Sequence, residues 1–194
     1  MADLTFESTY FEKPGPGNTE KALNIAKKHA EEQGLKTIII ASTTGGTAEK
    51  ALDIFDVDKF NIIIVTHSYY FTGSKNRQEF PGDKLEELNK SGLKVFSGTH
   101  SMSGIERNVR KSMNQWCFVD LYAKYLREQF SQGTKVCMEI TSMAVDAGLI
   151  KNLEEDVIVV GGTGRGADTV CLIKPAPTSE FNKLRMKAIL AKPL

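Results

Sequence analysis

Residues 37–47, TIIIASTTGGT, decide the fold of this 194-residue chain. The run Ile38-Ile39-Ile40 is short, β-branched and apolar on both faces, which predicts a strand buried between two layers. A loop of serine, threonine and glycine follows it, and residues 46–55 are expected to form a helix. A strand that leads through a glycine-rich turn into a helix is typical of α/β proteins with a parallel sheet.

The same alternation of apolar strands and amphipathic helices recurs along the chain, which predicts a three-layer α/β/α fold with a mostly parallel sheet. The last two predicted strands are joined by too little chain for a helical crossover, so one of them is expected to be an antiparallel edge strand. No linker interrupts the pattern, and residues 1–194 are expected to form a single domain. The other predicted strands are 61–66, 94–97, 157–160, 169–173 and 184–190, the last at an edge, and the other predicted helices are 18–33, a short one from 81 to 92, 103–112, 118–130 and 134–147.

Composition excludes several classes of function. The chain is 41% hydrophobic and 25% charged with a net charge of +1, so a nucleic-acid-binding footprint is not expected. The N-terminus lacks the pattern of a signal peptide, and no apolar run approaches the ~20 residues of a membrane span, which together predict a cytoplasmic protein. Cys117, Cys137 and Cys171 lie among apolar neighbours and match no zinc spacing, so reduced core thiols are expected and no metal site is predicted.

Loops rich in glycine and hydroxyl side chains follow four of the predicted parallel strands. These loops should emerge at one edge of the sheet, which is where open α/β sheets bind ligands. We therefore predict that a small phosphorylated molecule binds there. The candidate ligand-binding residues are Ser42, Thr43, Thr44, Gly45, Gly46, Thr47, Thr66, His67, Tyr69, Phe71, Thr99, His100, Ser103, Gly104, Arg107, Gly161, Gly162, Thr163, Gly164, Arg165, Gly166 and Asp168.

The 42–47 loop is the expected phosphate site. Gly45 and Gly46 let backbone amides approach an anion, hydroxyls add donors, and the following helix presents its positive end. The alternative is a tight strand-to-helix turn whose hydroxyls serve only as caps.

The 161–168 loop, GGTGRGAD, combines backbone amides with a guanidinium that can bind phosphate through two hydrogen bonds. It matches neither the dinucleotide-binding fingerprint nor a Walker A loop. The alternative is a structural turn in which Arg165 and Asp168 pair with each other.

Histidines and aromatic residues follow two of the strands. His67 and His100 each come directly after a strand. This shared position makes a functional role as well supported as a structural one. Tyr69, Tyr70 and Phe71 would either stack against a flat aromatic ligand or hold the loop to the body of the protein.

Other polar and aromatic residues are expected to be structural. Glu139 and Asp146 on the predicted 134–147 helix are expected to be partners of arginines or helix N-termini. His29 is expected to be solvated, and Trp116 to pack in a core or interface. No serine-hydrolase elbow and no glycosidase acid pair is present.

Two stretches resemble the C-terminal domain of pyruvate kinases: IIIASTTGGTAEKAL (38–52) and NIIIVT (61–66). In some pyruvate kinases the corresponding loop holds a phosphate of a sugar-bisphosphate effector. Further segments extend the likeness and resemble a small, mostly archaeal family of stand-alone pyruvate kinase C-terminal-domain-like proteins of unassigned activity. These segments are YFEKPGPGNTEKAL (10–23), ASTTGGTA (41–48), VTHSYYF (65–71), SGTHSMSGIER (97–107), KVCMEITSMAVDAGLI (135–150) and VVGGTGRGADT (159–169).

The resemblance implies flavin mononucleotide (FMN), or a similar nucleotide, at the strand ends, and flavin-dependent redox chemistry if the protein is an enzyme. The alternative is a non-catalytic regulatory module that senses a sugar phosphate or nucleotide. Pyruvate kinase activity is not expected, because the chain lacks the barrel that carries the metal, phosphoenolpyruvate and ADP sites. Homo-oligomerisation is left open.

Overall fold

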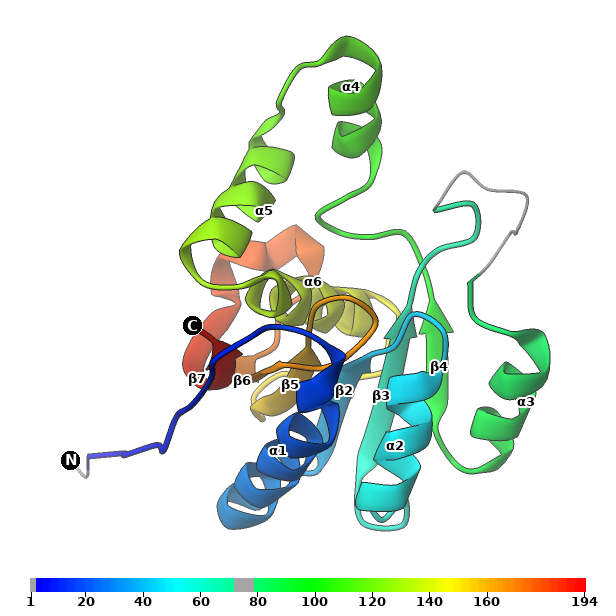
Figure 1. Ribbon diagram of the computed structural model, residues 1–194, viewed down its shortest axis with the longest axis vertical. Helices are drawn as coiled ribbons and strands as arrows, with labels where there is room; N and C mark the ends of the chain where they lie inside the picture. The colour runs from blue at the N-terminus through cyan, green and yellow to red at the C-terminus, as the bar shows by residue number, and fades with distance from the viewer. Residues whose placement is uncertain (1–2, 72–78) are drawn as a thin grey trace.

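Seven strands form one mixed sheet in the order β1-β7-β6-β5-β2-β3-β4 (Figure 1). The structure is a computed structural model, and it describes residues 3–71 and 79–194. The strands are β1 (Thr9–Phe11), β2 (Thr37–Ala41), β3 (Asn61–Thr66), β4 (Lys94–Ser97), β5 (Val157–Gly161), β6 (Thr169–Lys174) and β7 (Arg185–Pro193). The helices are α1 (Thr19–Gln33), α2 (Gly46–Ile54), α3 (Gly82–Lys90), α4 (Ile105–Met113), α5 (Phe118–Gln129) and α6 (Gln132–Asp146), with 3₁₀ turns η1 (Pro16–Asn18) and η2 (Thr178–Lys183).

Helices cover both faces of the sheet, which explains why its central strands are apolar throughout. Ile38 and Ile40 of β2 belong to a core cluster with residues of α1 and α2. Ile39, between them in sequence, points the other way and belongs to a second cluster with residues of α6. All three isoleucines are fully buried. Successive side chains of a strand point to opposite faces, so one apolar run supplies both cores.

The prediction of a mostly parallel sheet is confirmed. β2 pairs in parallel with both β3 and β5, and β3 pairs in parallel with β4. The carboxyl ends of these four strands, and the loops that follow them, therefore lie at the same edge of the sheet. Each predicted helix is present, with its ends shifted by at most a few residues.

The antiparallel strand is β6, which runs against β5 and β7. The prediction that residues 184–190 form an edge strand is wrong. β7 lies inside the sheet because the three-residue strand β1 pairs with it in parallel, Thr9 opposite Ala191 and Phe11 opposite Pro193. Three residues carry too little pattern for a strand to be predicted from sequence alone, and β1 gains its partner only when the two ends of the chain meet.

Two further expectations are wrong. His29 is not solvated; it is buried on α1, and its Nδ1 lies 3.7 Å from the Glu32 carboxylate. Cys117 is only half-buried, unlike Cys137 and Cys171. Of the two alternatives for Trp116, the core is wrong and an interface stays a prediction, since its ring is partly exposed, with the Arg110 guanidinium 4.8 Å from its centroid.

Two features are absent from the described residues. No helix among them has both the length and the apolar character to cross a membrane. Within residues 3–71 and 79–194, no three or more histidine, cysteine, aspartate or glutamate side chains gather in a way that could hold a metal ion.

Helix α6 approaches the sheet so closely that Gly161 at the end of β5 has no room for a side chain. A Cβ there would lie 2.6 Å from the Gly133 carbonyl oxygen and 3.0 Å from Cys137 Sγ. We expect Gly161→Ala to lower the free energy of unfolding by ~1–3 kcal/mol, because α6 must move to relieve the overlap. Chemical denaturation followed by circular dichroism measures it. Gly17→Ala is the control, since a Cβ at Gly17 meets nothing within 4 Å, and equal stability of the two variants would contradict the close approach.

Candidate functional site

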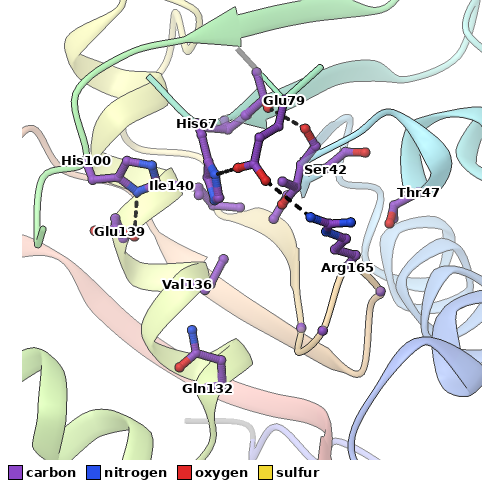
Figure 2. A pocket seen from close by; sticks show the side chains of 17 residues that line it. Ser42, Thr47, His67, Glu79, His100, Gln132, Val136, Glu139, Ile140 and Arg165 are labelled. Carbon is purple, nitrogen blue, oxygen red and sulfur yellow. Dashed lines mark hydrogen bonds and ion pairs between the residues drawn. The ribbon is translucent and has the colours of Figure 1, made fainter. Parts of the chain in front are cut away.

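A cavity of about 270 Å³ opens at the carboxyl ends of the parallel strands, between the start of α2 and the first half of α6 (Figure 2). Residues of the loops after β2, β3, β4 and β5 line it, because these four parallel strands end at the same edge of the sheet. The residues that line it are Ala41, Ser42, Thr43, Thr47, Val65, Thr66, His67, Glu79, His100, Gln132, Val136, Glu139, Ile140, Gly162, Gly164, Arg165 and Gly166.

The loop after β2 leaves backbone amides at the start of α2 without an internal partner. The Ser42 amide donates to the Val65 carbonyl at 3.0 Å, which continues the β2–β3 ladder. The Ser42 hydroxyl then accepts a hydrogen bond from the Ala48 amide at 3.3 Å. Among the described residues, no acceptor is bonded to the amides of Gly46 and Thr47. These two amides and the positive end of α2 make this loop a place for an anion.

Three residues of this loop that were predicted to bind ligand do not line the cavity: Thr44, Gly45 and Gly46. Gly45 has φ +94°, and a Cβ there would lie 2.1 Å from Cδ of Lys84 on α3. Its glycine is therefore explained by the turn and by the packing of α3, and a bulky substitution would disturb both without reporting on a ligand.

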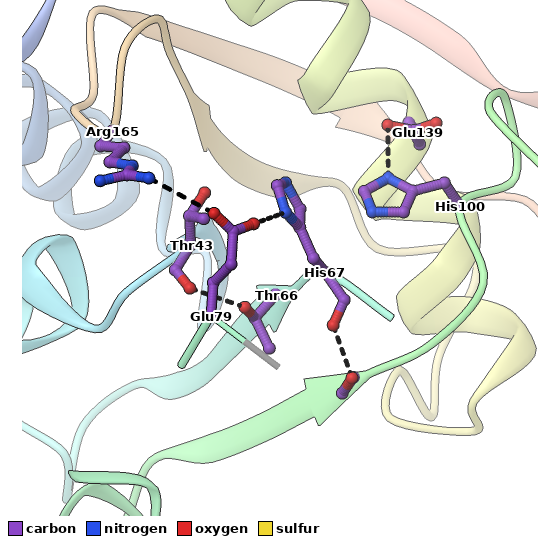
Figure 3. A network of polar contacts seen from close by, with 8 residues as sticks. Thr43, Thr66, His67, Glu79, His100, Glu139 and Arg165 are labelled. Atoms are coloured by element: carbon purple, nitrogen blue, oxygen red, sulfur yellow. Dashed lines mark hydrogen bonds and ion pairs between the residues drawn. The ribbon is translucent and has the colours of Figure 1, made fainter. Parts of the chain in front are cut away.

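Glu79 lines the cavity and contacts residues of two different loops (Figure 3). Its Oε2 lies 2.6 Å from Nδ1 of His67, and its Oε1 lies 3.4 Å from the Arg165 guanidinium. Glu79 itself is mostly buried, whereas the Arg165 side chain is 69% exposed. The interpretation that Arg165 pairs with Asp168 is wrong: the Asp168 carboxylate accepts from the Gly15 amide and the Thr169 hydroxyl, whereas Arg165 pairs with Glu79.

A buried ionic cluster lies on the α6 side of the cavity. Glu139 of α6 accepts hydrogen bonds from the Met102 amide at 3.0 Å and from Nδ1 of His100 at 3.3 Å. The Lys135 ammonium, one turn earlier on the helix, lies 2.5 Å from the same carboxylate and 3.4 Å from the Ser103 hydroxyl. The side chains of Lys135 and Glu139 are each only 3% exposed. The cluster fixes the loop after β4 against α6.

Burial and neighbouring charges shift the titration of these groups in opposite directions. Burial alone would raise the pKa of the Glu139 carboxyl, but the hydrogen bond from His100 and the charge of Lys135 lower that pKa to about 2. Burial lowers the pKa of the Lys135 ammonium, and its ion pair with Glu139 opposes this shift. Burial also lowers the pKa of His67, against the opposing effect of the Glu79 hydrogen bond. Glu139 therefore remains ionised across the physiological range.

The N-terminal turn at Gly15 and Pro16 packs against the 161–168 loop. Asp168, fully buried, accepts a hydrogen bond from the Gly15 amide at 2.8 Å. A Cβ on Gly166 would lie 2.2 Å from Cα of Pro16. Arg165 adopts a left-handed backbone conformation with φ +67°. Asp168 is thus a structural residue that supports the loop, while Gly162, Gly164, Arg165 and Gly166 line the cavity.

The remaining predicted residues lie near the cavity without lining it. The Phe71 ring stacks on His100 at 4.3 Å, and the Arg107 guanidinium lies 4.0 Å from the Phe71 centroid. Tyr69 is exposed. Thr99, Ser103 and Gly104 line a neighbouring pocket that shares His100 with the cavity. Gly161 packs under α6, and Thr163 lies on the same loop as Arg165 but does not line the cavity.

Sequence reasoning missed the contribution of α6 and of the loop before α3. Glu139 was expected to be a structural partner, and Gln132, Val136, Ile140 and Glu79 were not considered. A signal was available for Glu139: Lys135 and Glu139 are four residues apart on an otherwise apolar helix, a spacing that pairs opposite charges. No comparable signal marks Glu79, whose partners are distant in sequence.

Comparison with known proteins agrees with this architecture. The family model described as pyruvate kinase, alpha/beta domain, matches residues 20–173. The chain belongs to this family. The matched residues include the loops that line the cavity, so the resemblance seen in the sequence segments is confirmed for this pyruvate kinase α/β domain.

One solved structure is similar at a greater distance. It is the crystal structure of an O-ureido-L-serine synthase, a lysine-to-alanine mutant with O-ureido-L-serine bound. The two chains are 14% identical with a TM-score of 0.29, and the match covers 72% of this chain and 49% of that one. The chain thus spans about half the length of the synthase.

Lys135 is expected to be required for stability because it neutralises a buried carboxylate. Lys135→Met should lower the free energy of unfolding by ~3 kcal/mol or more, since it leaves Glu139 without its cation. Adding Glu139→Gln should recover part of this loss. The matched control is Lys174→Met, which breaks an exposed pair with Glu154 at 2.9 Å and should cost less than about 1 kcal/mol. Equal losses in a denaturation series would contradict a special role for the buried pair.

Proposed function

We propose that this pyruvate kinase α/β domain binds a small phosphorylated ligand, with the phosphate at the start of α2. One observation carries the proposal: Thr47, whose backbone amide at the start of α2 has no acceptor among the described residues, lines the same cavity as the hydroxyls of Thr43 and Thr66 and the Arg165 side chain. Amides at a helix N-terminus and a guanidinium are the groups that proteins commonly use to hold phosphate. No lysine or arginine lies in the 42–47 loop itself, so Arg165 would supply the positive charge.

Arg165 is suited to bind an incoming anion. Its pair with Glu79 is long, at 3.4 Å, and its side chain is mostly exposed. An exposed pair of this kind contributes little to stability, so a phosphate could replace it at small cost. Glu79 would keep its shorter contact to His67, at 2.6 Å.

FMN is the first ligand to test. Its phosphate fits the start of α2, and the apolar side chains of Val136, Ile140 and Val65 offer a wall for part of the ring. When bound, the flavin would supply electron-transfer chemistry, and the residues around it would set its environment. FMN is large, however, and the cavity volume of about 270 Å³ lies just below the ~300–1000 Å³ typical of ligand sites. Its ring system would therefore extend through the mouth.

The cavity volume favours a second candidate, a compact sugar phosphate held entirely inside. A regulatory module that senses such a ligand would need no cofactor. The absorbance spectrum of the purified protein separates the two candidates, because bound flavin absorbs visible light and a sugar phosphate does not. Calorimetric titration with FMN, ribulose 5-phosphate and inorganic phosphate then measures the affinity of each, and binding of none of them would refute the proposal.

Arg165→Ala is expected to weaken binding of the phosphorylated ligand by roughly 10- to 100-fold, because a charge-assisted contact worth ~1.5–3 kcal/mol is removed. The free energy of unfolding should change by no more than about 0.5 kcal/mol, as for other surface substitutions. Arg185→Ala, an exposed arginine on β7, is the matched control. Unchanged affinity together with a lower melting temperature would make Arg165 only a structural partner of Glu79.

We do not propose pyruvate kinase activity. The matched family is the α/β domain of pyruvate kinase, and the described residues form one open sheet rather than a barrel that could hold the metal, phosphoenolpyruvate and ADP. A purified chain of these 194 residues should therefore produce no pyruvate from phosphoenolpyruvate and ADP in a coupled assay. Turnover that scales with protein concentration would refute this expectation.

A further inference from the structure

Two histidines lie side by side in the cavity, and each is held by its own carboxylate (Figure 3). Nδ1 of His67 lies 2.6 Å from Glu79 Oε2, and Nδ1 of His100 lies 3.3 Å from Glu139 Oε2. The two ring centroids are 5.0 Å apart. Glu139 is ionised and only accepts hydrogen bonds, so Nδ1 of His100 carries the proton and Nε2 of His100 is the nitrogen left for a ligand. This is the arrangement by which carboxylates orient catalytic imidazoles.

His100 shows that this arrangement is incomplete without a ligand. Its side chain is only 10% exposed, and its Nε2 is buried without a hydrogen-bond partner in the part of the chain that the structure describes. A buried polar atom without a partner is destabilising and uncommon in folded proteins. Nε2 points toward His67 in the close-up view, and both residues line the cavity. A hydroxyl or carbonyl group of a bound molecule would supply the missing partner.

The surroundings of the pair favour the neutral form of His67. Burial lowers the pKa of His67, and repulsion from His100 adds to this shift, while Glu79 and Glu139 oppose it. Two imidazoles this close therefore resist carrying a positive charge at the same time. The Lys135 ammonium and the Arg107 guanidinium also lie near His100, the first through Glu139 and the second across the Phe71 ring. A neutral imidazole is the form that can act as a base, so the lowered pKa suits His67 to that role.

We propose that the cavity is a proton-transfer site, in which His67 and His100 act as general base and general acid on a phosphorylated hydroxycarbonyl compound. The inference rests on the proposed function, because phosphate at the start of α2 would place the rest of the molecule along the cavity toward the histidines. In Figure 2, Ser42 and His67 lie between Thr47 and His100. The small cavity suits a ketose phosphate, which carries a carbonyl, a neighbouring hydroxyl and a phosphate.

The chemical step is an enolisation that balances without any co-reactant. His67 removes the proton from the carbon beside the carbonyl, and the electron pair of that C–H bond forms a carbon–carbon double bond. His100 gives its proton to the carbonyl oxygen as the carbon–oxygen double bond becomes single. When His67 returns a proton to the same carbon and the new hydroxyl gives its proton back to His100, the result is an exchange. When the proton goes to the other carbon and the neighbouring hydroxyl gives its proton to His100, the result is an aldose–ketose isomerisation, with no net oxidation.

Proton exchange in D₂O tests this inference directly. Dihydroxyacetone phosphate, ribulose 5-phosphate and fructose 6-phosphate are each incubated with the protein, and proton NMR follows loss of the signal beside the carbonyl. Calorimetry under the same conditions measures binding of each compound. We expect at least one compound to bind and to exchange at least ten times faster than in buffer, a threshold well below the roughly 100- to 10,000-fold that general acid–base catalysis typically contributes.

Variants assign the step to the two histidines. His67→Gln and His100→Gln should each lower the exchange rate by about 100-fold or more, while the dissociation constant changes by less than about threefold. His29→Gln, which alters the third histidine on α1 outside the cavity, is the control and should exchange like the parent. Melting temperatures show that each variant is folded, and Glu79→Gln provides a second, milder change if His67→Gln unfolds.

The outcomes separate this inference from the proposed function. If ribulose 5-phosphate, the other two sugar phosphates, FMN and inorganic phosphate all fail to bind, the proposed function fails and the inference falls with it. If a sugar phosphate binds but exchanges no faster than in buffer, the protein is a binding module and the proton-transfer inference is overturned. Exchange that survives in both histidine variants would overturn the assignment of the residues.

Discussion

The carboxylate of Glu139 joins helix α6 to the loop that follows β4, and much of the site depends on this contact. It accepts hydrogen bonds from the Met102 amide and from His100, and it pairs with Lys135. An ionised carboxylate is costly to bury unless donors surround it, and here three donors do so. The loop after β4 has no regular structure of its own, so the position of His100 in the cavity follows from the position of α6.

The close packing of α6 on the sheet is therefore a condition for the site. Glycines at both sides of the contact make it close: a Cβ on Gly133 would lie 2.1 Å from Thr169 Oγ1, and one on Gly161 would lie 2.6 Å from the Gly133 carbonyl oxygen. This approach brings Val136 and Ile140 to the cavity wall and Glu139 to the loop. Glycines that resemble ligand-binding residues in sequence can thus serve the packing that creates a ligand site.

The opposite wall depends on the two ends of the chain. The N-terminal turn supports the 161–168 loop through the Gly15 amide on Asp168 and through Thr19, whose hydroxyl accepts from the Ala167 amide at 3.1 Å. β1 then pairs with β7 and forms one edge of the sheet. Arg165 projects from this loop, and its side chain is 69% exposed. An anion could therefore reach the guanidinium without any change in the sheet.

The sequence by itself determined the alternation of strands and helices, the parallel direction of the central strands and the edge of the sheet at which their glycine- and hydroxyl-rich loops meet. These follow from local patterns, since apolar runs such as residues 38–40 must lie between two layers and parallel strands end at one edge. It also indicated His67, His100 and Arg165 as residues of that edge. Within the 161–168 loop, however, it could not separate the cavity-lining Arg165 from the structural Asp168.

Only the tertiary structure decided which polar groups meet. Glu79 pairs with His67 and Arg165, and Glu139 reaches His100, because loops and helices far apart in sequence converge at the ends of the strands. Tertiary structure likewise placed β7 inside the sheet, since its partner β1 lies at the other end of the chain. Local sequence patterns indicate which side chains are buried and whether they repeat with the period of a helix or a strand. They do not indicate which residues far apart in the sequence come within contact distance after folding.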